Sequence, residues 1–205
     1  MNRSAALRSP PAPTDGARIG ILGGSFNPAH DGHRHISLHA LDLLQLDQVW
    51  WLVSPQNPLK SPEGMATIDE RYQSCRDLLG DNPRIVPTDL EIGLGTRKTA
   101  ETLRKLVDQY SGCRFVWLMG ADNLIQIARW ADWSDIFETM PVAVLARPTY
   151  AAKALSSKAA RQFAANRVDA SGAPELADMP TPAWLYLDIE PHPASATAIR
   201  NGRVL

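Results

Sequence analysis

Short apolar runs alternate with amphipathic stretches along most of this chain. The apolar runs are mostly continuous rather than alternating, which is typical of strands buried on both faces of a sheet. We predict strands at residues 18–22, 49–54, 84–88, 114–119, 142–146 and 184–189. Helical periodicity predicts helices at 33–46, 68–79, 99–110 and 151–165, and an interrupted helical stretch from 122 to 138. Residues 169–182 are rich in Pro, Gly and Ala and are predicted to form a loop.

This alternation of strands and helices predicts an α/β fold with a Rossmann-like, doubly wound parallel sheet and right-handed crossovers. Residues 18–205 are expected to form a single domain. Ligands of such sheets bind beyond the carboxyl ends of the strands, near the switch in strand order. Residues 1–17 contain several Pro, Ser, Ala and Arg residues without periodicity, so we expect a disordered tail. A transit peptide is the alternative for this tail, but its prolines and the lack of an amphipathic stripe argue against it.

Composition narrows the class of partner. The 205 residues include 21 Lys or Arg and 22 Asp or Glu, so the net charge of −1 suggests neither nucleic acid nor an anionic membrane as a partner. No apolar run approaches the roughly 20 residues of a membrane span. Cys75 and Cys113 form no Cys-x-x-Cys pair, so we expect neither a disulfide framework nor a zinc site, and a cytoplasmic location. The sequence leaves homo-oligomer formation open.

The glycine-rich turn at residues 23–33, Gly-Gly-Ser-Phe-Asn-Pro-Ala-His-Asp-Gly-His, joins the first strand to the first helix. Backbone N–H groups at such a helix N-terminus suit phosphate. His30 and His33 are three residues apart and are expected on one helix face, whereas His35 should point elsewhere. The turn matches neither the Gly-x-Gly-x-x-Gly fingerprint nor the P-loop. The alternative is an ordinary connection with histidines on its surface.

Two motifs resemble one superfamily. Residues 24–33 resemble the Gly-x-Phe-x-Pro-x-His-x-Gly-His signature of the adenylyl- and cytidylyltransferases, and residues 195–200, Ser-Ala-Thr-Ala-Ile-Arg, resemble its second signature. Gly120 and Asp122 resemble a Gly-Ala-Asp turn that holds the adenosine ribose, although Asp122 could instead be a helix N-cap. Lys60 follows the second strand where that family often has a lysine. A solvated loop lysine is the alternative for Lys60.

Two further segments resemble the bacterial nicotinate-nucleotide adenylyltransferases in particular. Trp130 matches a tryptophan that stacks on the nicotinate ring, with core packing as the alternative. Lys98 and Thr99 open a segment similar to Tyr-Thr-x-Asp-Thr-Leu at the border of the pyridine pocket, with Lys98 in place of the usual tyrosine. N–H groups at that helix start would favour the carboxylate of nicotinate over the amide of nicotinamide.

The resemblance implies an adenylyltransferase that transfers AMP from ATP to nicotinate mononucleotide, with Mg²⁺ held mainly by the phosphates and no dedicated metal ligands. It assigns catalysis to His33, His30 and Arg200. The residues expected to bind ATP and its phosphates are Gly24, Ser25, Phe26, His30, Lys60, Gly120, Asp122, Ser195, Thr197, Ile199 and Arg200. The residues expected to bind nicotinate mononucleotide are Ser25, Lys60, Lys98, Thr99 and Trp130.

Three alternative functions stay open at this point. Two are sister adenylyltransferases that act on nicotinamide mononucleotide or on phosphopantetheine, and the third is a catalytically silent nucleotide-binding module on the same scaffold. Trp130 and Thr99 argue against phosphopantetheine, and the intact His30, His33 and Arg200 argue against a silent module. Only five residues follow Arg200, so a helix behind it would be too short to be stable alone. We therefore expect bound triphosphate to order this end of the chain.

Overall fold

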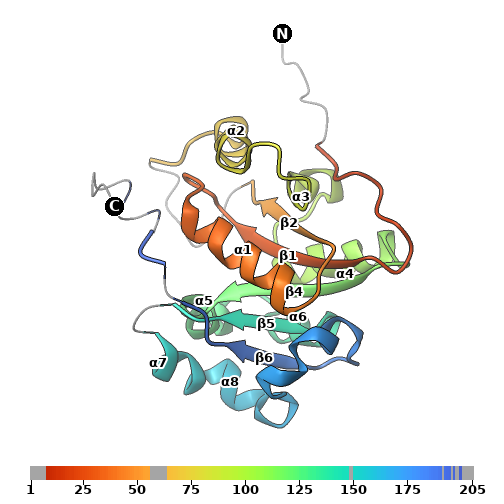
Figure 1. Cartoon of the computed structure of the whole chain (residues 1–205), viewed down its shortest axis with the longest axis vertical. Helices are drawn as coiled ribbons and strands as arrows, with labels where there is room; N and C mark the ends of the chain where they lie inside the picture. Colours follow the sequence, from red (N-terminus) through yellow and green to blue (C-terminus); the bar gives the residue numbers. More distant parts are fainter. Residues whose placement is uncertain are drawn as a thin grey trace.

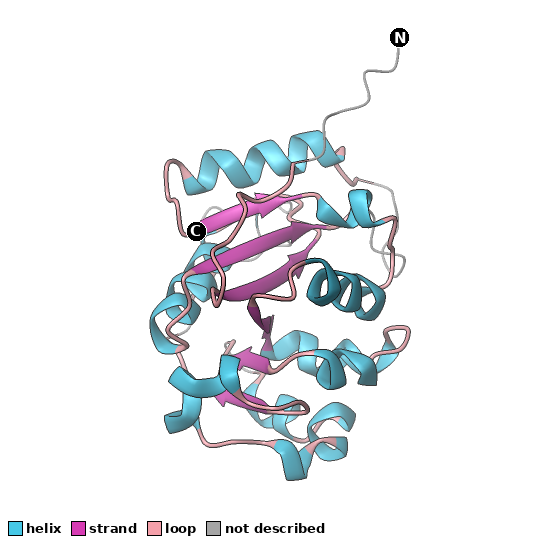
Figure 2. Ribbon diagram, turned by 90° about the vertical axis from the view of Figure 1, so that its right-hand side faces the viewer, coloured by secondary structure: helices cyan, strands magenta, loops and turns pink. Residues whose placement is uncertain are grey.

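All six predicted strands are present in the computed structural model, which describes residues 8–55, 64–147, 150–190, 192–194, 196 and 199. Each begins and ends within two residues of its predicted bounds. The strands are β1 (Arg18–Gly24), β2 (Gln48–Val53), β3 (Ile85–Thr88), β4 (Arg114–Gly120), β5 (Val142–Leu145) and β6 (Trp184–Leu187). Most of their residues are buried, because helices cover both faces of the sheet (Figures 1 and 2).

The strands form one parallel sheet in the order β3-β2-β1-β4-β5-β6. The chain builds outward from β1 to β3 and then returns to the other side of β1 to add β4. This is the doubly wound arrangement that we predicted, with its switch point between β1 and β4. In Figure 1 the strands run toward the left, so their carboxyl ends share the left-hand edge of the molecule.

The helices agree with prediction less closely than the strands. Helix α1 starts two residues earlier than expected, the predicted helix at 151–165 is broken, and the short α3 was missed. Ser157 begins the second part of the broken helix by accepting a hydrogen bond from the N–H of Ala160 at 3.2 Å. The α-helices are α1 (Asp31–Leu43), α2 (Ile68–Leu79), α3 (Leu90–Leu94), α4 (Thr99–Gln109), α5 (Ala121–Gln126), α6 (Ser134–Thr139), α7 (Ala151–Leu155) and α8 (Lys158–Gln162). The 3-10 helices are η1 (Ile127–Arg129), η2 (Ala164–Asn166) and η3 (Ala170–Asp178).

The prediction of a loop at 169–182 is wrong over most of this range, because η3 occupies Ala170–Asp178. The Asp169 side chain starts it by accepting a hydrogen bond from the N–H of Ser171 at 2.9 Å. Leu176 is fully buried and anchors the turns against β4 and β6. A 3-10 helix tolerates the Pro and Gly of this stretch better than an α-helix does, so composition alone was misleading. In the part of the chain that the structure describes, no helix is long and apolar enough to cross a membrane.

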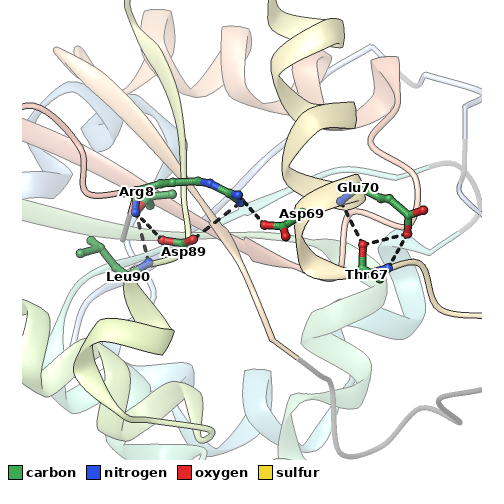
Figure 3. A network of polar contacts seen from close by, with 7 residues as sticks. Arg8, Thr67, Asp69, Glu70, Asp89 and Leu90 are labelled. Atoms are coloured by element: carbon green, nitrogen blue, oxygen red, sulfur yellow. Dashed lines mark hydrogen bonds and ion pairs between the residues drawn. The ribbon is translucent and has the colours of Figure 1, made fainter. Parts of the chain in front are cut away.

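Residues 8–17, expected to be part of a disordered tail, instead lie against the domain. The Arg8 N–H donates to Asp89 Oδ1 at 2.8 Å, and the Arg8 carbonyl accepts from Thr88 Oγ1 at 2.6 Å, at the end of β3. The Arg8 guanidinium forms ion pairs with Asp69 and Asp89 (Figure 3). It also lies 4.4 Å from the centre of the Tyr72 ring. Polar contacts of Arg8 thus hold the start of this arm against β3 and α2, although its sequence has no periodic pattern. Residues 1–7 lie outside the described residues.

Candidate active site

The glycine-rich turn lies at the switch point of the sheet, between β1 and α1. Phe26 stands in this turn with a φ of 45°, a left-handed conformation that is unusual for an aromatic residue. Its buried ring stacks on Trp51 at 4.9 Å between ring centres and lies 4.7 Å from the His33 ring. Trp51 in turn donates to Ser37 Oγ of α1 at 2.7 Å. This packing fixes the turn and the first turn of α1 relative to β2.

His30 and His33 lie side by side, as their spacing predicted. His30 is the N-cap of α1, and the two ring centres are 3.8 Å apart. The backbone N–H of His30 donates to Nδ1 of His33 at 3.3 Å. A ring nitrogen that accepts carries no proton, so in the neutral form of His33 the proton is on Nε2. His35 points elsewhere, as expected, and its Nε2 contacts the carbonyl of Glu190 at 2.6 Å.

His30 is neutral in this site. Burial, then the charge of Arg147, then that of His192 lower its pKa to about 4 from the ordinary 6.5, against a small opposing effect of Asp31. Its Nδ1 is buried and forms no hydrogen bond with any described residue. A buried ring nitrogen without a partner is costly, and a bound ligand would relieve that cost.

The loop after β6 returns to these histidines. A Cβ added at Gly32 would lie 2.8 Å from the carbonyl oxygen of Ala194 and 2.9 Å from His30 Nδ1, so only glycine leaves room here. In Figure 1 this segment (blue) runs up the left-hand edge, across the strand ends. Ala194, the residue just before the second signature, therefore lies beside the first. Ile199 is exposed, whereas Ser195, Thr197, Arg200 and also Lys60 lie outside the described residues.

The turn after β4 places Asp122 on the other side of the switch point. Gly120 is the N-cap of α5, and Asp122 lies in its first turn, so the alternative role of Asp122 as the N-cap is not what the structure shows. Asp122 Oδ1 is buried and lies 3.3 Å from Nε of Arg147. A Cβ at Gly120 would come within 2.5 Å of that carboxylate oxygen. The two predicted residues of this turn therefore form one close-packed unit.

The two segments expected to border a pyridine pocket are joined by an ion pair. Lys98 is the N-cap of α4, and its Nζ lies 3.2 Å from Asp132 Oδ2, two residues beyond Trp130. Thr99 is the first residue of α4 and is half-buried, as is Trp130. Trp133, in contrast, packs edge-on against Phe137 and Phe163.

Sequence reasoning missed three polar residues around the site, namely Arg71, Glu91 and Arg147. Arg71 is buried, and its guanidinium donates four hydrogen bonds of 2.6 to 3.0 Å to the carbonyl oxygens of Ser25, Ser54, Pro55 and Ala66. It thereby ties the glycine-rich turn to the end of β2 and to the segment before α2. An arginine on a helix with many polar residues carries no signal of burial in the sequence.

Glu91 and Arg147 were missed for different reasons. Glu91 is buried in α3 and accepts a hydrogen bond from Thr102 Oγ1 of α4 at 3.1 Å. Burial raises the pKa of Glu91 to about 7, against the lowering effect of that hydrogen bond. Arg147 follows β5 directly, so the signal that drew attention to Lys60, a cation just after a strand, could have found it. Among the residues that the structure describes, no group of three His, Cys, Asp or Glu side chains could hold a metal ion.

Comparison with known proteins shows the family of this chain. A sequence profile described as cytidylyltransferase-like matches residues 21–202. Two curated relatives are named "probable nicotinate-nucleotide adenylyltransferase". The one from Parvibaculum lavamentivorans is 50% identical and covers 92% of this chain and 93% of its own. The one from Cereibacter sphaeroides is 53% identical and covers 89% of this chain and 96% of its own.

Solved structures show the same fold. The nicotinic acid mononucleotide adenylyltransferase of Plasmodium falciparum, complexed with NaAD, aligns over 90% of this chain and 83% of its own, with a TM-score of 0.65 and 15% identity. The paired histidines, the Asp122 turn and the switch-point geometry thus occur on a scaffold that these proteins share. The chain belongs to the cytidylyltransferase-like family, and these two curated relatives at about half identity bear the name of nicotinate-nucleotide adenylyltransferases.

Proposed function

We propose that this protein is a nicotinate-nucleotide adenylyltransferase, which transfers AMP from ATP to nicotinate mononucleotide and yields nicotinate adenine dinucleotide and pyrophosphate. The observation that carries the proposal is the pair of histidines side by side at the N-terminus of α1, at the switch point of the sheet. Two imidazoles and a helix N-terminus together favour a polyphosphate. The curated relatives that bear this name cover nearly the whole chain.

The mechanism follows from the chemistry of the acceptor. The phosphate of the mononucleotide is already an anion, so it attacks the α-phosphorus of ATP in line without a general base. Catalysis then depends on positioning and on stabilising charge in the transition state. We assign Nε2–H of His33 to the α-phosphate, because its direction is fixed by the hydrogen bond from the His30 N–H. His30 and Arg200 are assigned to the β- and γ-phosphates, and Ser195 and Thr197 donate to phosphate oxygens.

The remaining assignments divide between the two substrates. Asp122 is assigned to the ribose of ATP, with Gly120 leaving space for it, and Lys60 to phosphate. Trp130, Thr99 and Lys98 are assigned to the nicotinate end. The polar groups of the glycine-rich turn and the start of α1 are imidazoles and N–H groups, which suit phosphate oxygens better than Mg²⁺, a hard cation that prefers oxygen ligands. Mg²⁺ is therefore proposed to enter with ATP, held by its phosphates, and to supply charge neutralisation there.

An acceptor panel tests the proposal. Pyrophosphate release from ATP is measured with nicotinate mononucleotide, nicotinamide mononucleotide and phosphopantetheine. We expect the highest kcat/KM with nicotinate mononucleotide, because a carboxylate gains more than an amide from the N–H groups at the start of α4. A preference for either other acceptor would replace the proposed substrate. No turnover with any of the three, despite ATP binding, would favour the silent nucleotide-binding module.

Lys98 offers a sharper test of the acceptor site. We expect Lys98→Ala to raise KM for nicotinate mononucleotide about tenfold, the size of a lost charge-assisted hydrogen bond, and to leave KM for ATP unchanged. Lys105→Ala on the same helix is the matched control, because Lys105 lies about two turns beyond Lys98 and also pairs with a carboxylate, that of Glu101. Equal effects of the two substitutions would show that Lys98 does not contact the acceptor.

A further inference from the structure

Arg147 is a cation beside the candidate site that no step above uses. It follows β5, and its Nε lies 3.3 Å from Oδ1 of Asp122, at the end of the neighbouring strand β4. About a quarter of each side chain is exposed. A Cβ at Gly120 would lie 2.8 Å from Arg147 Nε and 2.5 Å from Asp122 Oδ1. The glycine therefore leaves the space that the pair fills.

The same guanidinium acts on His30. After burial, the charge of Arg147 is the largest cause of the low pKa of His30. The other ionisable groups that face His30 are His192, which also lowers its pKa, Asp31, which raises it, and the neighbouring ring of His33. Arg147 and His192 line one small pocket together with Gly32, at the N-terminus of α1. The guanidinium thus lies between the carboxylate on the β4 side and the imidazole on the β1 side of the switch point.

Two buried atoms at this place have unmet hydrogen-bonding capacity. His30 Nδ1 and Asp122 Oδ1 are both buried and form no hydrogen bond with the described residues. The contact between Arg147 and Asp122 is an ion pair without hydrogen-bond geometry. The carboxylate is therefore held in place but keeps its capacity to accept from a ligand, for example from ribose hydroxyls. A purely structural pair would be expected to satisfy its own hydrogen bonds.

We propose that Arg147 is a positioning residue of the ATP site, which orients Asp122 toward the ribose and keeps fixed positive charge beside His30. The proposal rests on the function proposed above, since it takes ATP as the ligand of these residues. It makes one side chain responsible for aligning the ribose contact with the phosphate contacts. Because the pair is partly exposed, its contribution to stability is small and variants at Arg147 should fold.

Ribose analogues test the first half of the proposal. Pyrophosphate release is compared for ATP, 2′-deoxy-ATP and 3′-deoxy-ATP in the wild type and in Asp122→Ala, Arg147→Ala, Arg147→Lys and Arg161→Ala. Arg161 is exposed on α8 and controls for the loss of one positive charge. We expect the wild type and Arg161→Ala to prefer ATP at least tenfold over one deoxy analogue. Arg147→Ala and Asp122→Ala should both lose that preference.

The outcomes separate this inference from the proposed function. If Asp122→Ala loses the preference and Arg147→Ala keeps it, the positioning role is wrong while the ATP site stands. If Asp122→Ala keeps it, the ribose assignment fails, and this inference fails with it. Thermal unfolding of every variant shows whether a loss reflects misfolding.

Titration of His30 followed by NMR tests the second half. Arg147→Ala should raise the pKa of His30 toward its ordinary value. Arg147→Lys should leave this pKa near that of the wild type, because lysine keeps the positive charge even though it lacks the planar fork of arginine. A merely structural role for Arg147 would not give this split. An unchanged pKa in Arg147→Ala would overturn the electrostatic part of the proposal.

Discussion

At the residue scale, the feature that matters most is how firmly His33 is held. Its ring lies against His30, Phe26 and Trp51, with ring centres 3.8, 4.7 and 5.9 Å away. The N–H of His30 fixes its tautomer. A donor that is oriented before the substrate binds does not have to reorient during the reaction, so it stabilises the transition state at no reorganisation cost. This residue is therefore the one whose loss should cost the most turnover.

We predict that His33→Ala lowers kcat about 10²–10³-fold, the usual cost of losing one donor to transition-state charge. The thermal midpoint should fall only slightly, because the His33 side chain is half-buried. Steady-state kinetics and thermal unfolding measure the two effects. His39→Ala, further along the same helix, is the control and should turn over at the wild-type rate. Near-normal kcat in His33→Ala would refute the assignment.

Arg200 gives a second prediction at the residue scale. Its guanidinium fork can span two phosphate oxygens, so Arg200→Ala should raise the Kd for ATP and leave KM for nicotinate mononucleotide unchanged. ATP should also protect residues 195–205 of the wild type from hydrogen exchange, since bound triphosphate is expected to order them. Calorimetry and exchange mass spectrometry measure the two effects. Unchanged ATP affinity together with no protection would assign the triphosphate to His30, His33 and Lys60 alone.

At the scale of elements, the sequence predicts what depends on local pattern. Continuous apolar runs located all six strands, and the three-residue spacing of His30 and His33 placed them together. What it missed depends on contacts between distant segments. The four carbonyl groups that surround Arg71 come from three separate parts of the chain. The helix η3 is stabilised by burial against β4 and β6 and not by its own composition.

Arg71 gives the prediction that belongs to this scale. Lysine keeps the charge of Arg71 but places its donors on one atom, so it cannot reach all four carbonyl oxygens. We expect Arg71→Lys to lower the free energy of unfolding by about 2–4 kcal/mol, the cost of leaving two buried acceptors without donors. KM for ATP should rise as well, because Ser25 in the glycine-rich turn loses its anchor. Urea unfolding and steady-state kinetics measure the two effects, and a stability like that of the wild type would contradict the bracing role.

The N-terminal arm supports β3 and α2 in a similar way. Arg8→Ala should lower the free energy of unfolding by about 1–2 kcal/mol, because the buried Asp89 carboxylate loses its cation. Asp69→Ala should cost less than about 1 kcal/mol, because the Asp69 side chain is 62% exposed. Urea unfolding of both variants measures the difference. Equal costs for the two would mean that the arm is held by its exposed ion pair and not by its contact with Asp89.

At the scale of the whole molecule, the doubly wound sheet is what assembles the site. Residues from the turn after β1, the turn after β4 and the end of β5 meet because parallel strands end at one edge. The fold also buries two ionisable groups, His30 and Glu91, and burial moves their pKa values in opposite directions. Their effects on stability therefore oppose each other over the same pH range.

The pH dependence of folding tests that opposition. The pKa of His30 is about 4 in the folded protein and 6.5 ordinarily, so the unfolded chain binds more protons between these values, and the His30 contribution to stability is lost as pH falls from 6.5 to 4. Glu91 has a pKa of about 7 when folded and 4.5 ordinarily, so its contribution is lost as pH rises from 4.5 to 7. In the wild type the two effects partly cancel.

Glu91→Gln should separate them. The amide still accepts from Thr102 and cannot ionise, so this variant should gain at most about 3 kcal/mol over the wild type at pH 8 and nothing at pH 4.5. Its stability should then rise with pH between 4 and 6.5, because only the His30 effect remains there. Urea unfolding at pH 4.5, 6 and 8 measures both trends. A gain of equal size at all three values would mean that Glu91 destabilises the fold through its shape or packing and not through the ionisation of a buried carboxyl group.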